Sequence, residues 1–298
     1  MEVFNYGILI PGKLVRRVNR FVCEVEFESE VGRLIECYMA NPGSMLGMCV
    51  KDARVRVSSC TGINRKFKYS IEAININGTW IGCNTHVANK IVTRLFRDSK
   101  IWNDILPFQF DSFQSEVKLG NSRIDFVLGR TSGEAKIFVE VKTVTMSSDW
   151  YHVETGNLRA DKPFHRFPNT CPPECQKCDC EDSKIALFPD CESIRALKHV
   201  TDMVSHSTPP ASFAALVYVV MRDDIEAVSP SVYCDANYSK AVQAAMNSGV
   251  LFVALKCKLL VDCAENPRIE LVCQVPVLKS EFTVEDILTS TRTKRKRI

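Results

Sequence analysis

Apolar and polar residues alternate along much of the first 83 positions, a pattern that predicts short strands with one buried face. The expected strands are Val15–Phe27, Gly32–Met39, Ala53–Ser58, Lys68–Asn75 and Thr79–Cys83. The Asn41-Pro42-Gly43 sequence between the second and third strands is a strong turn signal. Five short strands in a stretch of this length favour a small barrel.

From residue 84 the pattern changes to helices alternating with strands, which is typical of an α/β domain. Helices are expected at Asn84–Arg97, Glu192–Met203 and Ala236–Asn247. Strands are expected at Phe113–Leu119, Arg123–Leu128, Lys136–Met146, Phe213–Val220, Val250–Lys256 and Arg268–Val275. We therefore predict a barrel domain at residues 1–83, an α/β (α+β) domain at 84–282 and a tail at 283–298.

A polar segment at residues 147–186 interrupts this second domain as an insertion. It contains four closely spaced cysteines: Cys171, Cys175, Cys178 and Cys180. Four such thiolates can bind Zn²⁺ tetrahedrally and thereby order a loop. Their spacing is not the paired Cys-x2-Cys pattern of common zinc modules, so a flexible loop with reduced thiols is the alternative.

The composition is that of an ordinary globular protein, with 46% apolar and 24% charged residues. The longest apolar run, Phe213–Met221, is far shorter than the roughly 18 residues that a membrane span needs. Met1–Asn5 lacks the basic start and apolar stretch of a secretory signal. We expect an intracellular protein, cytoplasmic or nuclear, with no membrane partner.

The net charge of +3 is concentrated at the C-terminus, where residues 291–298 carry five basic residues and no acidic one. Without them, 33 basic residues face 35 acidic ones, a net charge of −2. The Lys294–Arg297 run resembles a nuclear-import signal or a phosphate-binding arm, and a solvated terminus is the alternative. A nucleic-acid surface elsewhere must therefore be a local patch.

Two basic clusters lie in the predicted barrel, for which the OB-fold, a frequent oligonucleotide binder, is the leading candidate. The basic residues of interest are Arg16, Arg17, Arg20, Lys66 and Lys68. Phe67 and Tyr69 alternate with the second cluster, and cations mixed with aromatic rings suit phosphates and stacked bases. The alternative is a solvated strand face.

Three polar residues in the second domain point to catalysis. Glu140 and Lys142 are two positions apart in a predicted strand, so their side chains project from the same face. Asp125 lies in the preceding strand within the apolar stretch Ile124–Leu128. Two carboxylates on adjacent strands repel each other, and a divalent cation between them would relieve both the repulsion and the cost of burial.

A cation held there would bind a phosphate oxygen and lower the pKa of a bound water, while Lys142 would stabilise the transition state. Mg²⁺ or Mn²⁺ suits such a site, and Glu116 on the strand before Asp125 is a further candidate ligand. Asp followed by Glu-x-Lys on the next strand is the signature of the PD-(D/E)-X-K nuclease fold. Taken alone, Glu-x-Lys is more often a surface salt bridge, because exposed strands often alternate charges.

Several segments together resemble the sugar fermentation stimulation protein A family. The most specific are Ser115–Lys118, Ser122–Phe126 and Val139–Thr145, with Asn41–Met45, Cys83–Asn89 and Lys198-His199 in the same order along the chain. The resemblance runs from about residue 7 to residue 275 outside the insertion. It implies an N-terminal OB-like domain followed by a PD-(D/E)-X-K restriction-endonuclease-like domain.

By this resemblance, Asp125, Glu140 and Lys142 match the catalytic triad and Glu116 matches an additional acidic position. Arg123 belongs to a matching segment, and Arg195 and Lys198 would lie on a helix that faces the site and hold phosphate. The helix departs from the family pattern, because Ile194-Arg195-Ala196 replaces an acidic residue followed by Arg-Gly.

Three functions remain open at this point. The first is a metal-dependent nuclease acting on DNA or RNA, and the second is a DNA-binding or regulatory protein that does not cleave. A small-molecule phosphodiesterase is the third, and the basic clusters of the barrel favour the first two over it. The oligomeric state is not predicted by any feature of the sequence.

Overall fold

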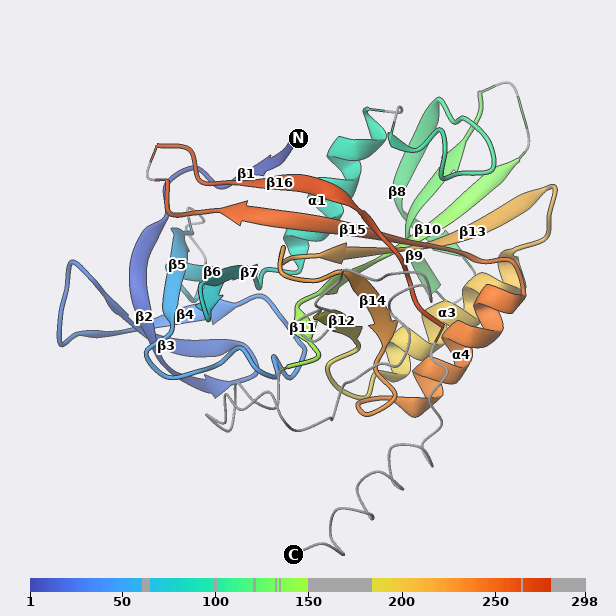
Figure 1. Ribbon diagram of the computed structural model, residues 1–298. Coiled ribbons are helices and arrows are strands. Elements are labelled where there is room, and N and C mark those ends of the chain that lie inside the picture. The colour runs from blue at the N-terminus through green and yellow to red at the C-terminus, as the bar shows by residue number, and fades with distance from the viewer. Residues whose placement is uncertain are drawn as a thin grey trace, which may run out of the picture.

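The structure, a computed structural model, describes residues 1–60, 65–98, 101–119, 122–131, 133, 135–149, 184–263 and 265–279. Within these residues a β-barrel and a layered α/β region lie side by side (Figure 1). Most of the predicted insertion, with its four cysteines, and the basic tail lie outside the described residues.

Five strands of the N-terminal region close into the barrel. They are β2 (Ile10–Asn19), β3 (Val22–Phe27), β4 (Leu34–Met39), β5 (Arg54–Ser59) and β6 (Tyr69–Ile76). Their order is β4-β3-β2-β5-β6, and a parallel pairing between β4 and β6 closes the ring. Inward-facing residues such as Leu14, Val25 and Ile71 are fully buried, as the alternation of apolar residues predicts.

Two barrel strands differ from the prediction. The stretch Val15–Phe27 belongs to two strands, β2 and β3, joined by a turn at Arg20 and Phe21. Asn19 stabilises this turn by accepting a hydrogen bond from the Phe21 N–H at 2.9 Å. Because the turn contains neither Gly nor Pro, composition does not reveal it. The last predicted strand is β7 (Thr79–Gly82), which pairs with β6 outside the closed ring.

A seven-stranded sheet forms the centre of the α/β region, in the order β1-β16-β15-β13-β10-β9-β8. Its strands are β1 (Glu2–Asn5), β8 (Ser112–Leu119), β9 (Ser122–Gly129), β10 (Lys136–Val144), β13 (Ser212–Val220), β15 (Leu251–Leu260) and β16 (Arg268–Val275). The central strands β10, β13 and β15 are parallel, whereas their outer neighbours are antiparallel. Residues 2–5, predicted as part of the barrel domain, instead pair with β16.

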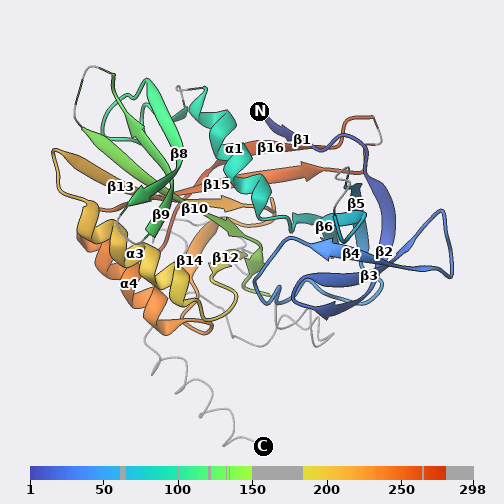
Figure 2. The ribbon, with the colours of Figure 1, turned by 180° about the vertical axis from the view of Figure 1, so that it is seen from behind.

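The sheet is covered on both faces by helices, as a mostly buried parallel centre requires. Alternate residues of β13 face opposite ways: Val217 packs in the core beneath α1 (His86–Phe96), and Leu216 packs beneath α3 (Ile194–His206) and α4 (Ala236–Asn247). The view from behind shows α1 separate from the α3 and α4 pair (Figure 2). The predicted order of helix, three strands, helix and strand is thus confirmed.

A small second sheet was not predicted. It consists of β11 (Met146–Ser147), β12 (Ile185–Phe188) and β14 (Ala227–Pro230), with β12 in the middle. These strands have two to four residues each, too few for periodicity to indicate a strand. No helix in the described residues combines the length and the apolar character that crossing a bilayer requires.

Polar contacts fix the barrel to the α/β region. The carboxylate of Asp190 accepts a hydrogen bond from the Met45 N–H at 2.7 Å, in the turn that follows β4. On another side, the Arg56 Nε and the Trp80 Nε1 donate to the Val261 carbonyl at 3.0 Å and to Asp262 at 2.8 Å. The Arg56 guanidinium also lies 4.9 Å from the centre of the Trp80 ring. The barrel is therefore held at two separate places.

Gly43 tests the first of these attachments. An added Cβ would clash with the Asp190 carboxylate, so Gly43→Ala must displace it from the Met45 N–H. We expect the free energy of unfolding to fall by about 1–3 kcal/mol, the cost of a buried donor without a partner. Urea denaturation measures this change, and Gly133→Ala, which meets only ordinary contacts, is the matched control. An equal loss for Gly43→Ala in an Asp190→Ala background would contradict the mechanism.

Candidate active site

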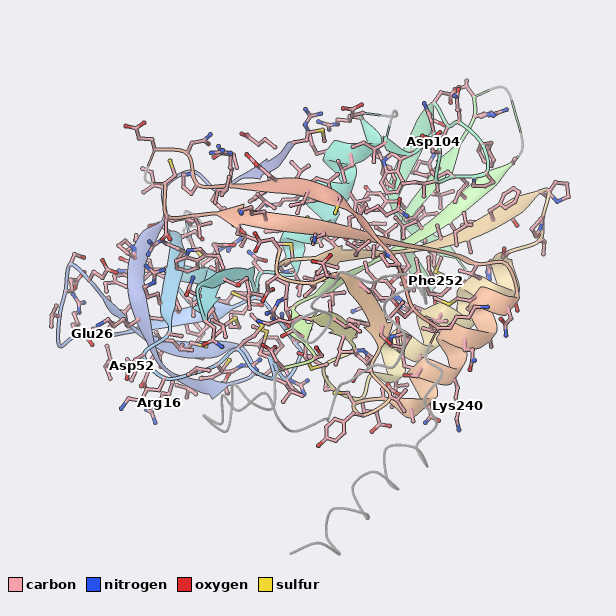
Figure 3. All side chains as sticks on the ribbon, viewed as in Figure 1. Arg16, Glu26, Asp52, Asp104, Lys240 and Phe252 are labelled. Atoms are coloured by element: carbon pink, nitrogen blue, oxygen red, sulfur yellow. The ribbon has the colours of Figure 1, made fainter. Side chains whose placement is uncertain are left out.

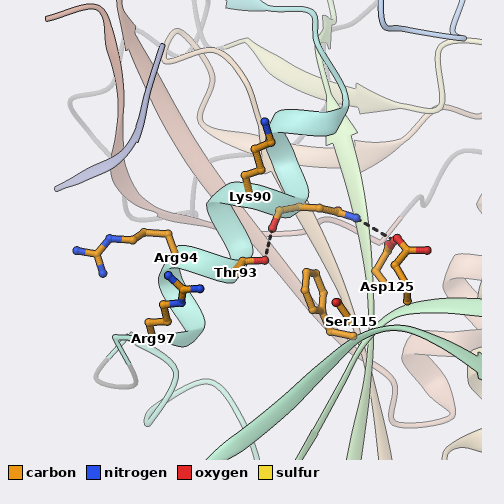
Figure 4. Close-up of a pocket in the computed structure, with 9 residues that line it drawn as sticks. Lys90, Thr93, Arg94, Arg97, Ser115 and Asp125 are labelled. Carbon is orange, nitrogen blue, oxygen red and sulfur yellow. Dashed lines mark hydrogen bonds between the residues drawn. The ribbon is translucent and has the colours of Figure 1, made fainter. Parts of the chain in front are cut away.

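The pairing between β9 and β10 ends where two of the predicted catalytic residues lie. The last pair in register is Phe126 with Val139, so Asp125 and Glu140 come next. At this point the Val141 N–H of β10 donates to Asp125 Oδ2 at 2.8 Å. The Asp125 side chain thus takes the acceptor role that a backbone carbonyl of β9 has in the regular part of the sheet. The other oxygen, Oδ1, accepts from Asn89 Nδ2 of α1 at 3.0 Å (Figure 4).

Glu140 is the most buried charged group of the site, with 2% of its surface exposed. Its Oε1 contacts Lys142 Nζ at 2.6 Å and also His199 Nδ1 of α3. Its Oε2 is buried and has no hydrogen-bond partner among the described residues. A buried carboxylate oxygen without a partner is costly, so this atom is available to a cation or a donor.

The pKa values of the two carboxyl groups are shifted in opposite directions. Burial raises the pKa of Asp125 above its ordinary value, and the negative charge of Glu140 adds to the rise. Burial also favours the neutral form of Glu140, but the hydrogen bond from His199 and the charge of Lys142 outweigh it. The pKa of Glu140 therefore lies below its ordinary value, and Glu140 is the more firmly ionised of the two.

His199 belongs to the site, although it was predicted only as part of a matching segment. The Ser193 side chain caps α3 by accepting from the Ala196 N–H at 3.1 Å, which sets where the helix begins. Its apolar side, with Ala196 and Val200, then packs on the sheet and carries His199 to Glu140. The sequence signal that could have identified His199 is its position as a histidine on the apolar side of a predicted helix.

The remaining predicted residues lie around this centre. Glu116 has a left-handed backbone (φ 55°), is exposed, and lies 3.5 Å from the Arg123 guanidinium in an ion pair. Lys198, on the outer side of α3, contacts Asp202 and Ser122. Arg195 is exposed on the same helix. The structure thus gathers Asp125, Glu140 and Lys142 directly and leaves the other four at the periphery.

A pocket of about 340 Å³ opens between α1 and the strands β8 and β9. It is lined by Asn89, Lys90, Thr93, Arg94, Arg97, Ser115, Glu116, Asp125 and Phe126. Figure 4 shows α1 with its basic side chains on one side and Ser115 and Asp125 on the other. The helix residues were not predicted, although cations at positions 90, 94 and 97 follow helical spacing.

The predicted basic residues of the barrel differ in their surroundings. Arg16, at the surface in Figure 3, forms a two-pronged ion pair with Glu24 at 2.7 and 2.8 Å. Arg17 donates to the backbone carbonyls of the turn that follows β4 and so stabilises that turn. The others are exposed and, among the described residues, have no ion pair or side-chain hydrogen bond: Arg20, Lys66 and Lys68.

Three aromatic rings form a row on the barrel surface. The Phe21 and Tyr38 rings lie 6.2 Å apart at 24°, and the Tyr38 and Phe67 rings lie 6.1 Å apart at 18°. Lys66 Nζ lies 5.2 Å from the centre of the Phe67 ring. These rings come from the β2–β3 turn, from β4 and from the segment before β6, so only the fold brings them together.

Comparisons with known proteins were made for the whole chain. The profile described as "SfsA N-terminal OB domain" matches residues 15–83. The profile described as "Sugar fermentation stimulation protein RE domain" matches residues 86–155 and 151–262. The first match confirms the predicted OB fold of the barrel, and the second covers most of the α/β region.

Individual relatives agree with these profiles. A "Sugar fermentation stimulation protein homolog" of Crocosphaera subtropica is 31% identical over 83% of this chain and 88% of its own. One from Allorhizobium ampelinum is 31% identical over 90% and 96%. "The structure of Pyrococcus Furiosus SfsA in complex with Ca2+" shares 18% identity, covers 93% of this chain and 99% of its own, and has a TM-score of 0.69. This last likeness shows a common fold.

The raised pKa of Asp125 predicts a pH-dependent effect on stability. A carboxyl whose pKa is higher in the folded state makes the folded protein less stable as it ionises with rising pH. In chelator-treated buffer we therefore expect Asp125→Asn to raise the Tm at pH 7, and the gain to shrink as the pH falls toward 4. An asparagine can still accept from the Val141 N–H through its one amide oxygen, and its NH2 can donate to the Asn89 side chain once the Asn89 amide turns to present its oxygen.

Thermal denaturation at several pH values measures this gain. Asp104→Asn, a change at an exposed carboxylate (Figure 3), is the control and should leave the Tm unchanged. A gain for Asp125→Asn that grows at acidic pH would show that the Asp125 charge is not the cause.

Proposed function

The chain belongs to the sugar fermentation stimulation protein family, and from its site we propose that it is a metal-dependent nuclease that hydrolyses phosphodiester bonds of DNA or RNA. The observation that carries the proposal is Glu140 Oε2, a buried carboxylate oxygen without a partner among the described residues. Glu140 lies on β10 at the position next in register to Asp125, whose pKa is raised by burial and, in addition, by the negative charge of Glu140.

The residues present fit a hard divalent cation such as Mg²⁺ or Mn²⁺. Asp125 and Glu140 would hold it, and Glu116 is the third candidate ligand. Mg²⁺ is often bound by one or two carboxylates, with water and substrate phosphate in its other positions. The fold relative from Pyrococcus furiosus is a complex with Ca²⁺, which is also a hard cation that takes oxygen ligands. When bound, such a cation neutralises phosphate charge and acidifies a coordinated water.

The chain's own groups supply the rest of the chemistry. Lys142 is anchored at 2.6 Å from Glu140 Oε1, which keeps a positive charge beside the position where the phosphate gains negative charge. His199 contacts the same oxygen and fixes the Glu140 side chain from the other side. Asn89 and the Val141 N–H orient Asp125 in the same way. Each reacting group is therefore positioned by a partner on a regular element.

Nucleic acid is the proposed substrate because the OB barrel offers a surface for it. The aromatic row of Phe21, Tyr38 and Phe67 provides flat apolar faces for bases. Exposed Arg20, Lys66 and Lys68 provide charge for phosphates, and stacking combined with cations is how OB-folds bind single strands.

A second candidate function is a DNA-binding regulatory protein that does not cleave. Within the described ranges, no group of three or more His, Cys, Asp or Glu is placed to hold a metal ion. The run Ile194-Arg195-Ala196 on α3 also lacks the acidic residue expected there from the family pattern. These observations favour a site that retains its fold and binds phosphate only.

A cleavage assay separates the two functions. Purified protein is incubated with labelled single-stranded DNA, duplex DNA and RNA in Mg²⁺ or Mn²⁺, beside Asp125→Ala and Glu140→Ala. We expect each change to lower the rate by about 1,000-fold or more, because a metal contributes several kcal/mol to the transition state. Binding should persist, and Asp104→Ala should cleave like the unmodified protein. Cleavage that survives in both variants would refute the site.

The aromatic row predicts a preference for unpaired bases. We expect Phe21→Ala and Phe67→Ala each to weaken single-stranded oligonucleotide binding by about 1–3 kcal/mol, the usual loss for one stacked base. Fluorescence anisotropy measures the dissociation constants, and Tyr233→Ala changes an exposed aromatic ring of the α/β region as a control. Equal losses for single-stranded and duplex DNA would argue against stacking.

A further inference from the structure

The pocket beside Asp125 continues along the exposed flank of α1. Its helix wall presents Lys90, Arg94 and Arg97, all exposed, and its strand wall presents Ser115 and Asp125 (Figure 4). The three cations are four and three positions apart, so they follow one side of the helix over about 10 Å. The pocket thus joins the candidate metal site to a line of positive charge.

These cations are not neutralised by neighbouring acids. No residue of α1 is acidic, and among the described residues Arg94 and Arg97 have no ion pair. Lys90 Nζ lies 5.6 Å from the centre of the Phe4 ring rather than beside a carboxylate. Lys90 and Arg94 are like charges four positions apart, a spacing that destabilises a helix, although the C-terminal end of the helix dipole offsets part of this cost for Arg94.

The acidic side chains of the pocket are confined to its strand side. Glu116 is already paired with Arg123 at 3.5 Å, and Asp125 is hydrogen-bonded by Asn89 and Val141. The chain outside residues 291–298 has a net charge of −2, so the three basic residues that line this one pocket are a local concentration. A ligand with one phosphate near Asp125 and further phosphates along α1 matches this distribution.

We propose that this α1 groove, defined by Lys90, Arg94 and Arg97, binds the sugar-phosphate backbone of the nucleic-acid strand next to the bond that is cleaved. The inference rests on the proposed function and deepens it, because a pocket that extends from Asp125 along α1 fits a substrate of several phosphates. Arginine suits this role, since its planar guanidinium binds phosphate with two parallel hydrogen bonds. A short phosphodiester would occupy only the end at Asp125.

The first experiment measures binding without metal. Fluorescein-labelled single-stranded oligonucleotide is titrated in EDTA at several KCl concentrations with Arg94→Gln/Arg97→Gln. Each phosphate contact contributes about 0.7 to the slope of log affinity against log salt for a single strand, so two lost contacts should lower the slope by about 1.4. Lys90→Gln should lower it by about 0.7.

The control is Lys136→Gln/Lys240→Gln, which removes two exposed charges of the same α/β region. Lys136 lies at the opposite end of β10, where it pairs with Gly129, and Lys240 is on α4 across the sheet (Figure 3). The control variant should show the same slope of log affinity against log salt as the unmodified protein. Circular dichroism should show folded protein for every variant, because all these side chains are exposed. Unchanged slopes for both groove variants would overturn the proposal.

The second experiment compares two substrates in Mn²⁺. We expect Arg94→Gln/Arg97→Gln to raise KM for an oligonucleotide by a much larger factor than KM for bis(p-nitrophenyl) phosphate. Equal losses on both substrates would overturn the groove and leave the nuclease intact. If no protein cleaves either substrate while the salt slope still falls in EDTA, the groove is supported and the nuclease proposal fails.

Discussion

The site depends on one interruption of the sheet, where the Asp125 carboxylate takes the Val141 N–H that a neighbouring carbonyl would otherwise bind. Because a buried N–H must have a partner, this exchange lets β9 and β10 diverge without leaving a donor unpaired. The pairing of β9 with β10 ends here, and Glu140 Oε2 beside it is left without a partner among the described residues. The Asp125 carboxylate therefore both completes the backbone hydrogen bonding and stands beside the candidate cation site.

The surrounding packing fixes this arrangement from both faces of the sheet. Asn89 reaches Asp125 from α1, whereas His199 reaches Glu140 from α3, and both helices are held by apolar residues on buried strands. The same contacts shift the two pKa values in opposite directions, because burial and the charge of Glu140 raise the pKa of Asp125 whereas His199 and Lys142 lower that of Glu140. A rigid scaffold is thus used to keep two like charges close together, an arrangement that lowers stability and is typical of functional sites.

Local spacing explains which parts the sequence predicts. Glu140 and Lys142 share a strand face by the two-residue period, and Asp125 stands out among apolar neighbours, so the centre of the site follows from the residues. Pairings between distant segments are not encoded locally: β1 pairs with β16 from the other end of the chain, and His199 meets Glu140 only after α3 docks. Likewise, the sequence shows that Arg16 and Arg17 are basic but not that Glu24 and a turn bind them.

Binding of a polyanion by a chain with a net charge of only +3 requires charge to be placed locally. Long-range attraction is weak at physiological salt, where the screening length is about 8 Å, so cations act mainly within direct reach of phosphate. The α1 groove meets this requirement beside Asp125, and the aromatic row on the barrel adds contacts that salt screens little. Because polar contacts fix the barrel to the α/β region at two places, a nucleic-acid strand that met both proposed surfaces would gain from their combined affinity.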